Sequence, residues 1–419
     1  MTNLILANEY CQSIFDGTHD TPKPASEGKP LITSKHISGG SLDSSSAYLI
    51  SEDDYLSIQQ RSAVSQWDIL FSMIGSVGEV YLEKNINIPY AIKNIGVFSC
   101  KNENKARWLY YYLISPSAKT HIQRYLNGAV QKFLPLGALR NFPVLSYDNS
   151  KNSLVKVLST IDAKIECNNR INEELESFAK ILYDYWFIQF DFPDENGKPY
   201  KSSGGKLVYN KALKRDIPAA WQAIELAEII SRSGTGLNPR DNFKLGNGDN
   251  YYVTIKNVNN GKIILDDKCD KIDDEALSII DRRSQLQVGD ILFTSIEPVG
   301  VTYLIHEKPS NWNINESVFT IRPDSQKTTS EHLFFLLSSS EMKVFTKNSS
   351  SGSIHKGIRH GVLKTFISAY SGKNLIDEFS TIIKPILKKI DILEKENQRL
   401  VQLRDWLLPM LMNGQVTVS

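Results

Sequence analysis

The sequence predicts an α+β protein, with two similar mixed α/β domains in a pseudo-two-fold tandem repeat, separated by two long antiparallel coiled-coil helices. Three observations predict this arrangement. A 16-residue stretch occurs twice, short strand-like runs and Gly/Ser/Asn turns surround each copy, and a long helical heptad pattern follows each copy. A chain of 419 residues is also long enough to form more than one hydrophobic core.

The internal repeat is the clearest pattern in the chain. WDILFSMIGSVGEVYL (67–82) aligns without a gap with GDILFTSIEPVGVTYL (289–304), and nine of the 16 positions are identical. Further pairs recur at nearly the same spacing: LITSK (31–35) with YVTIK (252–256), NGAVQK (127–132) with SGSIHK (351–356), LGALRNF (136–142) with HGVLKTF (360–366), and LSTI (158–161) with FSTI (379–382). The chain is therefore a tandem duplication of a unit of about half its length.

Each repeat ends in a long helix. Apolar or polar seam positions recur with steps of four and three, which is the a/d pattern of a coiled coil. The positions that we expect in the seam are Leu158, Ile161, Ile165, Asn172, Leu175 and Leu182 in the first helix, and Ile386, Leu393, Asn397 and Leu400 in the second. Both stripes are too apolar for isolated helices, so we expect the two helices to pack together. Pro385 predicts a kink or a fresh helix start.

The predicted boundaries follow from these patterns. The first domain (lobe 1) covers 1–148, the first long helix 149–190, a connector 191–217, the second domain (lobe 2) 218–372, and the second long helix 373–414. The connector is rich in Gly, Pro and Ser and has six basic residues between Lys198 and Arg215. A flexible linker and a phosphate-contacting segment both fit this composition.

Composition excludes several classes of protein. The net charge is only 48 − 47 = +1, so a nucleic-acid surface would have to be a local basic patch. The four cysteines form no CxxC pair, which is typical of free thiols in a reducing cytoplasm. The N-terminus has no signal-peptide pattern, and no run of about 18 apolar residues predicts a membrane span.

The glycines of the repeated stretch could suggest a cofactor loop, and the tetrapeptide NIPY (87–90) could suggest an adenine methyltransferase. The repeat argues against both interpretations. The counterpart of Gly75 is Glu297, whereas Gly78 is kept as Gly300, and NIPY has no partner in the second copy. A strand, a turn that needs glycine and a return strand explain what persists. We find no P-loop, HExxH or GxSxG motif, and no metal-ligand spacing, so we expect no catalytic residues and no metal site.

Two lobes held at a fixed separation suit a ligand with two spaced half-sites, and double-stranded DNA is such a ligand. A helix from Leu154 to Trp186 would be about 50 Å long, and half-sites one turn of DNA apart are separated by about 34 Å. Polar residues that recur in loops of both copies are our candidates for contacts with bases or phosphates. They are Thr33, Ser34, Lys35, Asn127, Gln131 and Lys132 in lobe 1, and Thr254, Lys256, Ser351, His355, Lys356 and Arg359 in lobe 2.

Several segments together carry a resemblance to a known family. They are DGTHDTP (16–22), DILF followed by a Val-Gly turn in both halves, YWFIQFDFPDENGKP (185–199), IPAAW (217–221) and LRDWLLPMLMNGQ (403–415). The whole chain resembles the DNA-specificity subunit of type I restriction–modification systems. The second DGTH-like segment, SGTGLNP (233–239), departs from the pattern because it lacks the His and the Asp. The two lobes should therefore read different half-sites.

The resemblance implies a non-catalytic, sequence-specific DNA-binding subunit in the cytoplasm. Each lobe would be a target-recognition domain for one half of a bipartite, asymmetric DNA sequence. The helices would set the spacer and dock two methyltransferase subunits, and motor-nuclease subunits would join them. The family implies no cofactor on this chain, with S-adenosylmethionine, ATP and magnesium on the partner subunits.

Two rival functions remain at this stage. A self-contained adenine DNA methyltransferase would label DNA when the purified chain is given S-adenosylmethionine alone. A coiled-coil adaptor without DNA contact would show no sequence-selective binding of duplex DNA even with its partners present.

Overall fold

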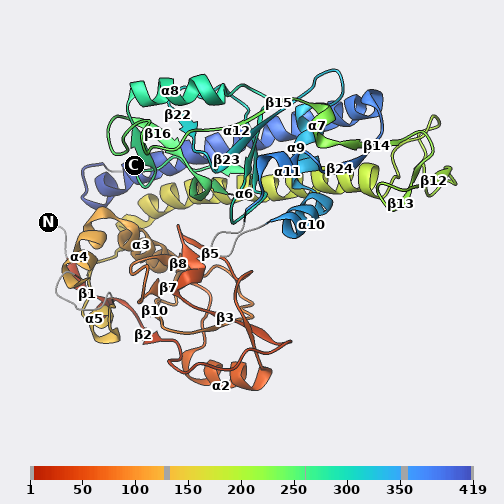
Figure 1. Ribbon diagram of the computed structural model, residues 1–419. Coiled ribbons are helices and arrows are strands. Elements are labelled where there is room, and N and C mark those ends of the chain that lie inside the picture. The colour runs from red at the N-terminus through yellow and green to blue at the C-terminus, as the bar shows by residue number, and fades with distance from the viewer. Residues whose placement is uncertain (1–3, 127–132, 260, 351–356, 417–419) are drawn as a thin grey trace. The chain divides into compact units, whose positions relative to one another are not determined.

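The structure, a computed structural model, describes residues 4–126, 133–259, 261–350 and 357–416 (Figure 1). The chain divides into two compact units: unit 1 comprises Met1–Asn168 with Glu396–Ser419, and unit 2 comprises Asn169–Lys395. Each unit therefore combines one lobe with part of each long helix.

Lobe 1 is built from small sheets with helices at their ends. Its main sheet has the strand order β2-β10-β7-β8, a second sheet has the order β6-β3-β9, and β1 pairs with β11 and β4 with β5. The strands are β1 (Leu4–Leu6), β2 (Ser13–Asp16), β3 (Lys29–Ile32), β4 (Ile37–Ser38), β5 (Ser41–Leu42), β6 (Leu49–Ile50), β7 (Asp68–Ser72), β8 (Val80–Leu82), β9 (Ala91–Ile92), β10 (Ile95–Ser99) and β11 (Pro143–Leu145). The helices are α1 (Ala7–Tyr10), α2 (Glu52–Ser62), α3 (Glu103–Ile114), α4 (Pro116–Leu126) and α5 (Leu136–Arg140).

Lobe 2 repeats this topology strand for strand. Its main sheet has the order β15-β23-β20-β21, its second sheet β19-β16-β22, and β14 pairs with β24 and β17 with β18. The strands are β14 (Gln222–Glu225), β15 (Ile230–Thr235), β16 (Asn250–Val253), β17 (Val258–Asn259), β18 (Lys262–Ile263), β19 (Asp270–Ile272), β20 (Ile291–Thr294), β21 (Thr302–Leu304), β22 (Trp312–Ile314), β23 (Val318–Pro323) and β24 (Ile367–Tyr370). The helices are α7 (Leu226–Ile229), α8 (Asp274–Ser284), α9 (Ser330–Ser338), α10 (Ser340–Ser349) and α11 (His360–Leu363). Equal strand orders confirm that the sequence repeat is a repeat of folded domains.

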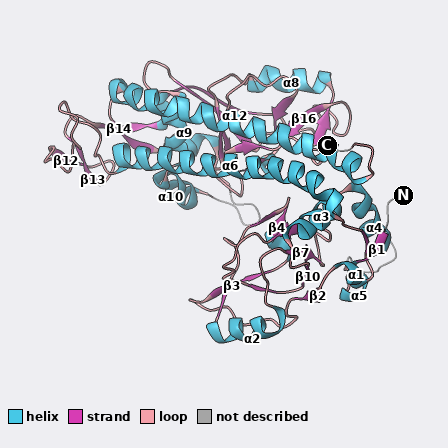
Figure 2. Ribbon diagram, turned by 180° about the vertical axis from the view of Figure 1, so that it is seen from behind, coloured by secondary structure: helices cyan, strands magenta, loops and turns pink. Residues whose placement is uncertain are grey.

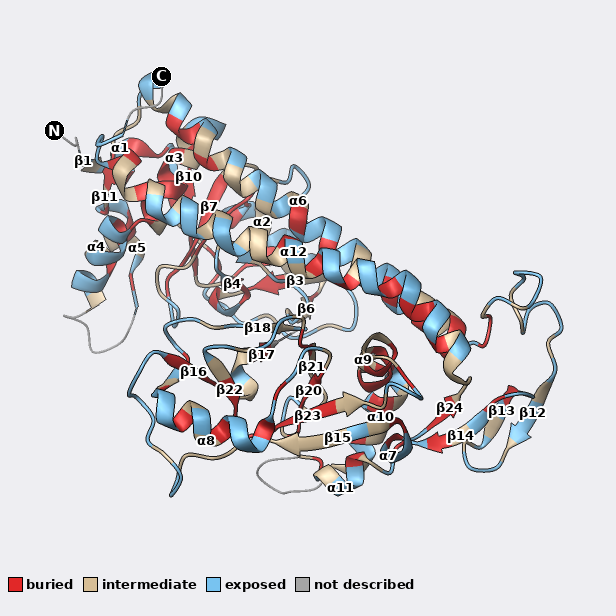
Figure 3. Cartoon of the chain, turned by 90° about the horizontal axis from the view of Figure 1, so that it is seen from above, coloured by how far each residue is buried: buried red, intermediate tan, exposed pale blue. Residues whose placement is uncertain are grey.

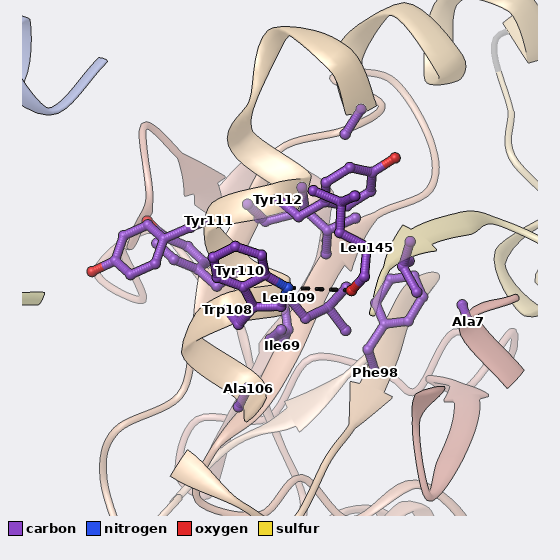
Figure 4. Close-up of a cluster of buried hydrophobic side chains, with 14 of the residues drawn as sticks. Ala7, Ile69, Phe98, Ala106, Trp108, Leu109, Tyr110, Tyr111, Tyr112 and Leu145 are labelled. Carbon is purple, nitrogen blue, oxygen red and sulfur yellow. Dashed lines mark hydrogen bonds between the residues drawn. The ribbon is translucent and has the colours of Figure 1, made fainter. Parts of the chain in front are cut away.

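The core of lobe 1 forms around α3, most of whose residues from Ala106 to Leu113 are buried. Asn102 starts this helix because its side chain accepts a hydrogen bond from the backbone N–H of Lys105. The Trp108 indole is buried but not left without a partner, since its N–H donates to the carbonyl oxygen of Leu145 at 3.2 Å (Figure 4). That bond fixes β11 beside the helix, and the same core continues onto Leu154, Leu158 and Leu408 of the long helices.

The two long helices are α6 (Asn152–Tyr183), continued by a π-helical turn at Asp184–Ile188, and α12 (Lys373–Met412). They run antiparallel within each unit. In unit 1 Asp162 contacts Arg404 and Asn168 contacts Asn397, and in unit 2 the rings of Tyr183 and Phe379 meet at 5.9 Å. Figure 2 shows these paired segments side by side, and Figure 3 shows buried and exposed residues alternating along both helices.

The predicted seam residues of the two long helices are all buried or half-buried. Leu158, Asn172 and Leu393 are buried, whereas the rest are half-buried: Ile161, Ile165, Leu175, Leu182, Ile386, Asn397 and Leu400. In unit 1 the Asn168 amide donates to Glu396 and Asn397, both at 2.9 Å, which places a polar layer inside the helix pair. Of the two alternatives predicted at Pro385, the fresh helix start is wrong, because α12 is continuous from Lys373 to Met412, whereas the kink stays a prediction. Pro385 is exposed, between the buried Ile383 and Leu387.

Each lobe contacts the long helices through residues at equivalent positions of the repeat, but these residues are polar in unit 1 and apolar in unit 2. In unit 1 the Tyr111 hydroxyl donates to Asp162 at 2.7 Å, and Arg404 donates to the same carboxylate at 3.0 Å. In unit 2 the repeat counterparts of these three residues are Phe335, Ile383 and Tyr183, all part of one apolar core, with the rings of Tyr183 and Phe335 stacked at 5.7 Å. One anchor is thus polar and the other apolar.

Candidate nucleic-acid interface

In lobe 1 a short turn displays Lys35 at the end of a parallel strand pair. β3 and β9 run parallel, with Ile32 opposite Ile92, and Thr33 to His36 form a 3₁₀ turn directly after β3. The His36 ring holds the turn, because its Nδ1 accepts the backbone N–H of Thr33 at 2.8 Å. Lys35 is exposed. A fixed backbone therefore presents a free ammonium group to solvent.

Lobe 2 builds the same turn with a different residue. β16 and β22 run parallel, with Val253 opposite Ile314, and the turn of Thr254 to Asn257 follows β16. Here the Asn257 side-chain oxygen accepts the backbone N–H of Thr254 at 2.9 Å, as His36 Nδ1 does in lobe 1. Lys256 is exposed like Lys35. The Asn257 amide nitrogen is fixed in turn by the sulfur of Cys269 at 2.9 Å.

The other predicted residues of these turns, Ser34, Thr33 and Thr254, contact groups of the protein itself. Ser34 is buried, and its hydroxyl donates to the carbonyl oxygen of Asn94, so it stabilises the turn and does not face solvent. The hydroxyl of Thr33 is 3.3 Å from His36 Nδ1, and that of Thr254 donates to Asn257 at 3.0 Å. Both threonines are half-buried. Lys35 and Lys256 are therefore the members of these turns that are best placed to reach a ligand.

The DGTH segment meets the Lys35 turn from the other side of the parallel pair. Gly17 passes so close to β9 that a Cβ atom would lie 2.4 Å from the carbonyl oxygen of Ile92. Thr18 donates from its backbone to that same carbonyl oxygen at 3.0 Å, and the exposed His19 reaches the Asn94 side chain at 2.8 Å. Gly236 makes the equivalent approach in lobe 2, where a Cβ would lie 1.8 Å from the carbonyl oxygen of Ile314. SGTGLNP thus keeps the glycine that the backbone requires and lacks the His and the Asp of the lobe 1 segment.

We call the resulting cluster the strand-end site. In lobe 1 it consists of Gly17–His19, Thr33–Lys35 and Lys93–Asn94, and in lobe 2 of Gly236–Asn238, Thr254–Lys256 and Asn315–Glu316. The backbone hydrogen bonds of the two sites correspond. The backbone N–H of Lys93 donates to the carbonyl oxygen of Ile32 at 2.8 Å, and that of Asn315 donates to the carbonyl oxygen of Val253 at 2.9 Å. The charges do not correspond, because Lys93 and Asn94 are replaced by Asn315 and the exposed acidic Glu316. The same backbone arrangement therefore carries different side-chain groups in the two lobes.

His36 also gives the first strand-end site a titratable element. Burial of the ring, followed by the positive charge of Lys35, lowers the pKa of His36 below its ordinary value. Hydrogen bonding to Ser46 and Thr33 and the charge of Asp43 oppose that shift. A neutral ring suits the structure, because only an unprotonated Nδ1 can accept the Thr33 N–H.

The repeated glycine stretch forms a hairpin in each lobe. β7 pairs with β8 and β20 with β21, which confirms the predicted strand, turn and return strand. Gly78 and Gly300 have φ values of 97° and 86°, a region that favours glycine. Ile74 bridges to Phe133, and Ile296 bridges to Gly357, so each hairpin loop meets the chain just after 127–132 or 351–356.

Six predicted contact residues lie outside the described residues: Asn127, Gln131, Lys132, Ser351, His355 and Lys356. Arg359 is described; it is exposed and precedes α11 as its N-cap residue. In lobe 1 the hairpin and the strand-end site are connected, because the backbone N–H of Gly39, in the β4–β5 turn after Lys35, donates to Glu79 at 2.9 Å. Glu79 directly follows Gly78.

Sequence reasoning missed His19, Lys93 and Asn94 as site residues. His19 belongs to a motif that was recognised, but nothing local shows that it meets Asn94, 75 positions away in the chain. Lys93 lies beside it and bonds Thr21. Among the described residues no group of three or more His, Cys, Asp or Glu side chains is placed to hold a metal ion. In the same ranges no helix has the length and apolar character of a membrane span.

Comparison with known proteins identifies the family. The model of the type I restriction modification DNA specificity domain matches residues 21–177 and again 218–367, which together exceed half of the chain. It describes a DNA specificity domain, not a methyltransferase, in each half, so the methyltransferase alternative loses its support.

Individual relatives are similar over most of their length. The chain is 23% identical to the type I restriction enzyme HindI specificity subunit of Haemophilus influenzae, over 85% of this chain and 88% of that protein. It is 22% identical to the MjaIX specificity subunit of Methanocaldococcus jannaschii, over 84% of this chain and 78% of that protein. The S subunit of a type I system from M. genitalium shares the fold, with a TM-score of 0.53 and 16% identity over 98% of this chain and 96% of that one. The chain belongs to the family of type I restriction–modification DNA specificity proteins.

Proposed function

We propose that each lobe reads one half of a bipartite, asymmetric DNA sequence, and that the strand-end sites contribute directly to this reading. The observation that carries the proposal is the repeated turn that presents Lys35 and Lys256 on equal frames. An exposed lysine on a fixed turn is suited to a phosphate contact, which positions a protein on DNA. The groups around it, His19, Lys93 and Asn94 in one lobe and Asn315 and Glu316 in the other, then meet the base edges.

The long helices would set the spacer between the half-sites and dock two methyltransferase subunits. Support comes from their length, 32 residues for α6 and 40 for α12, and from the fastening of each lobe to both helices within its own unit. Inserting one heptad into a long helix should lengthen the spacer or abolish binding. An unaltered spacer after the insertion would refute this role.

The remaining assembly follows the family. The methyltransferase subunits bind S-adenosylmethionine and methylate adenine, and motor-nuclease subunits use ATP and magnesium. This chain supplies recognition and binds none of these cofactors itself. We place the complex in the cytoplasm with the DNA that it reads.

Exchange of one lobe tests the proposal. Residues 1–148 are replaced with the first lobe of another family member, and the chain is expressed with its partner subunits in a host whose DNA is then sequenced for methylated adenine. One half-site should change, while the other half-site and the spacer stay the same. Exchange of 218–372 is the matched control and should change the other half. A change in both halves, or in neither, would refute the assignment of one half-site to each lobe.

A further inference from the structure

The connection between α6 and lobe 2 is a folded arm. Some 30 residues separate the π-helical turn that ends at Ile188 from β14, which begins at Gln222. Within this stretch β12 (Leu207–Asn210) and β13 (Arg215–Pro218) form an antiparallel hairpin. Connections between elements of a compact domain are mostly much shorter, with a median of about 4 to 6 residues. Figures 1, 2 and 3 all show the hairpin apart from the main sheet of lobe 2.

The base of this arm is rigid. The Phe192 ring stacks on Tyr200 at 4.8 Å and on Trp221 at 5.2 Å. The Asp191 carboxylate accepts both the backbone N–H and the hydroxyl of Ser202, each at 2.7 Å. Gly205 lies against Tyr200, where a Cβ would be 2.5 Å from the ring. A linker that only joined two elements would not need these contacts.

The positive charge of the arm is concentrated in its outer part, since its acidic residues, Asp191, Asp194, Glu195 and Asp216, lie nearer the two ends. The 17 residues from Lys198 to Lys214 contain five lysines and no Asp or Glu, in a chain whose net charge is +1. All five side chains are exposed, namely Lys198, Lys201, Lys206, Lys211 and Lys214. None of the five takes part in the ion pairs found among the described residues. The basic group at the base of the hairpin does have a partner, since Arg215 pairs with Glu341 at 2.6 Å.

We propose that this arm is a third DNA-binding element, which holds the phosphate backbone through the five lysines without reading bases. The proposal rests on the proposed function, because it takes the ligand of the lobes as the ligand of the arm. Lysine is a compact charge on a flexible stem and suits contacts to phosphate oxygens. Release of counterions makes such contacts favourable and dependent on salt. The exposed Tyr209, 64% accessible on the same hairpin, adds a flat surface beside these charges.

The test measures affinity for duplex DNA of mixed sequence as a function of salt, from about 50 to 200 mM. The full chain with all five lysines changed to alanine is compared with the unchanged chain. Each phosphate contact contributes about 0.9 to the magnitude of the slope of log affinity against log salt, so loss of all five contacts lowers that magnitude by about 4.5. Changing the same five lysines to arginine keeps the charge and should keep the slope. Hydrogen exchange of the backbone amides of β12 and β13 and the unfolding temperature report whether the arm remains folded.

The outcomes separate this proposal from the one on which it rests. A fall of one unit or more in the alanine variant, with the arginine variant unchanged, supports the arm as a phosphate-binding element. A smaller fall overturns it. If the slope is kept but the alanine variant no longer assembles with the methyltransferase subunits, the arm binds protein and the proposal is also overturned. If the unchanged chain shows no salt-dependent binding of DNA, the proposed function fails as well.

Discussion

Replacing Asp162 with alanine should destabilise unit 1 by about 3 kcal/mol. Asp162 connects lobe 1 to both long helices, since its carboxylate accepts from Tyr111 at 2.7 Å and from Arg404 at 3.0 Å. The side chains of Asp162 and Arg404 are only 13% and 18% exposed. Removing the carboxylate therefore leaves a largely desolvated guanidinium and a buried tyrosine hydroxyl that both lack this partner.

The magnitude follows from what remains. Breaking a buried ion pair by removing one partner costs about 3 to 5 kcal/mol. The lower end applies here, because Arg404 keeps its contact with Asp405 at 2.9 Å, and that aspartate is 57% exposed. Asp162→Asn is the matched control: its one amide oxygen can still accept from Arg404 in place of Oδ1, while its NH2 group replaces Oδ2 beside the Tyr111 hydroxyl, which can turn to accept, so the charge and one acceptor are lost. We expect this variant to lose about half as much stability, in line with the smaller worth of neutral hydrogen bonds.

Urea unfolding gives the total change, and hydrogen exchange of the α3 backbone amides assigns it to unit 1. The same exchange measured on α9 should stay unchanged, because the equivalent anchor in unit 2 consists of Phe335, Ile383 and Tyr183 and needs no ion pair. A loss below about 1 kcal/mol, typical of a surface ion pair, would show that the Asp162 network does not hold lobe 1 on the helices.

Two further predictions concern the strand-end sites. Burial and the charge of Lys35 lower the pKa of His36, so its contribution to stability is present above the unfolded pKa near 6.5 and is lost as pH falls through the lower folded value. His36→Asn places in lobe 1 the residue that lobe 2 has at Asn257. The unchanged chain should lose more stability than this variant between about pH 7 and pH 5, measured by urea unfolding at each pH. Equal losses in the two chains would contradict the role of the neutral ring. Gly236→Ala should destabilise lobe 2 by about 3 kcal/mol or more, the upper end of the usual cost of overpacking. The reason is that its Cβ would lie 1.8 Å from the backbone oxygen of Ile314, which cannot rotate away. Gly137→Ala, where nothing lies within 4 Å, is the control and should leave the unfolding temperature nearly unchanged.

The sequence predicted the duplicated fold because the repeat preserves the pattern that defines the main sheets. The identical Asp-Ile-Leu-Phe runs became β7 and β20, with Val-Gly turns leading into β8 and β21. A gap-free repeat with buried strands leaves little freedom for a different pairing in the second copy. The heptad patterns likewise predicted long helices. The prediction of a fresh helix start at Pro385 was wrong, because tertiary packing of the neighbouring turns outweighs the local preference of one residue.

The strand-end sites could not be found in this way. Their parts come from three separate segments, and a parallel strand pair with a long crossover brings these together. Parallel pairing has no short turn to mark it in the sequence. His36 and Asn257 fill the same role with different side chains, so an alignment scores them as a mismatch and only the hydrogen bonds to Thr33 and Thr254 reveal the equivalence.

The division between kept and changed residues shows where specificity can reside. The kept features fix the backbone: Gly17 and Gly236 approach the parallel strands, and the turns hold Lys35 and Lys256 alike. A lysine on an equivalent frame contributes equally to both halves, and a phosphate contact carries no sequence information. On the proposed function, the changed side chains around these lysines contribute to the difference between the two half-sites. Lys93–Asn94 offers donors where Asn315–Glu316 offers an acidic acceptor, and such a reversal is what reading a different base edge requires.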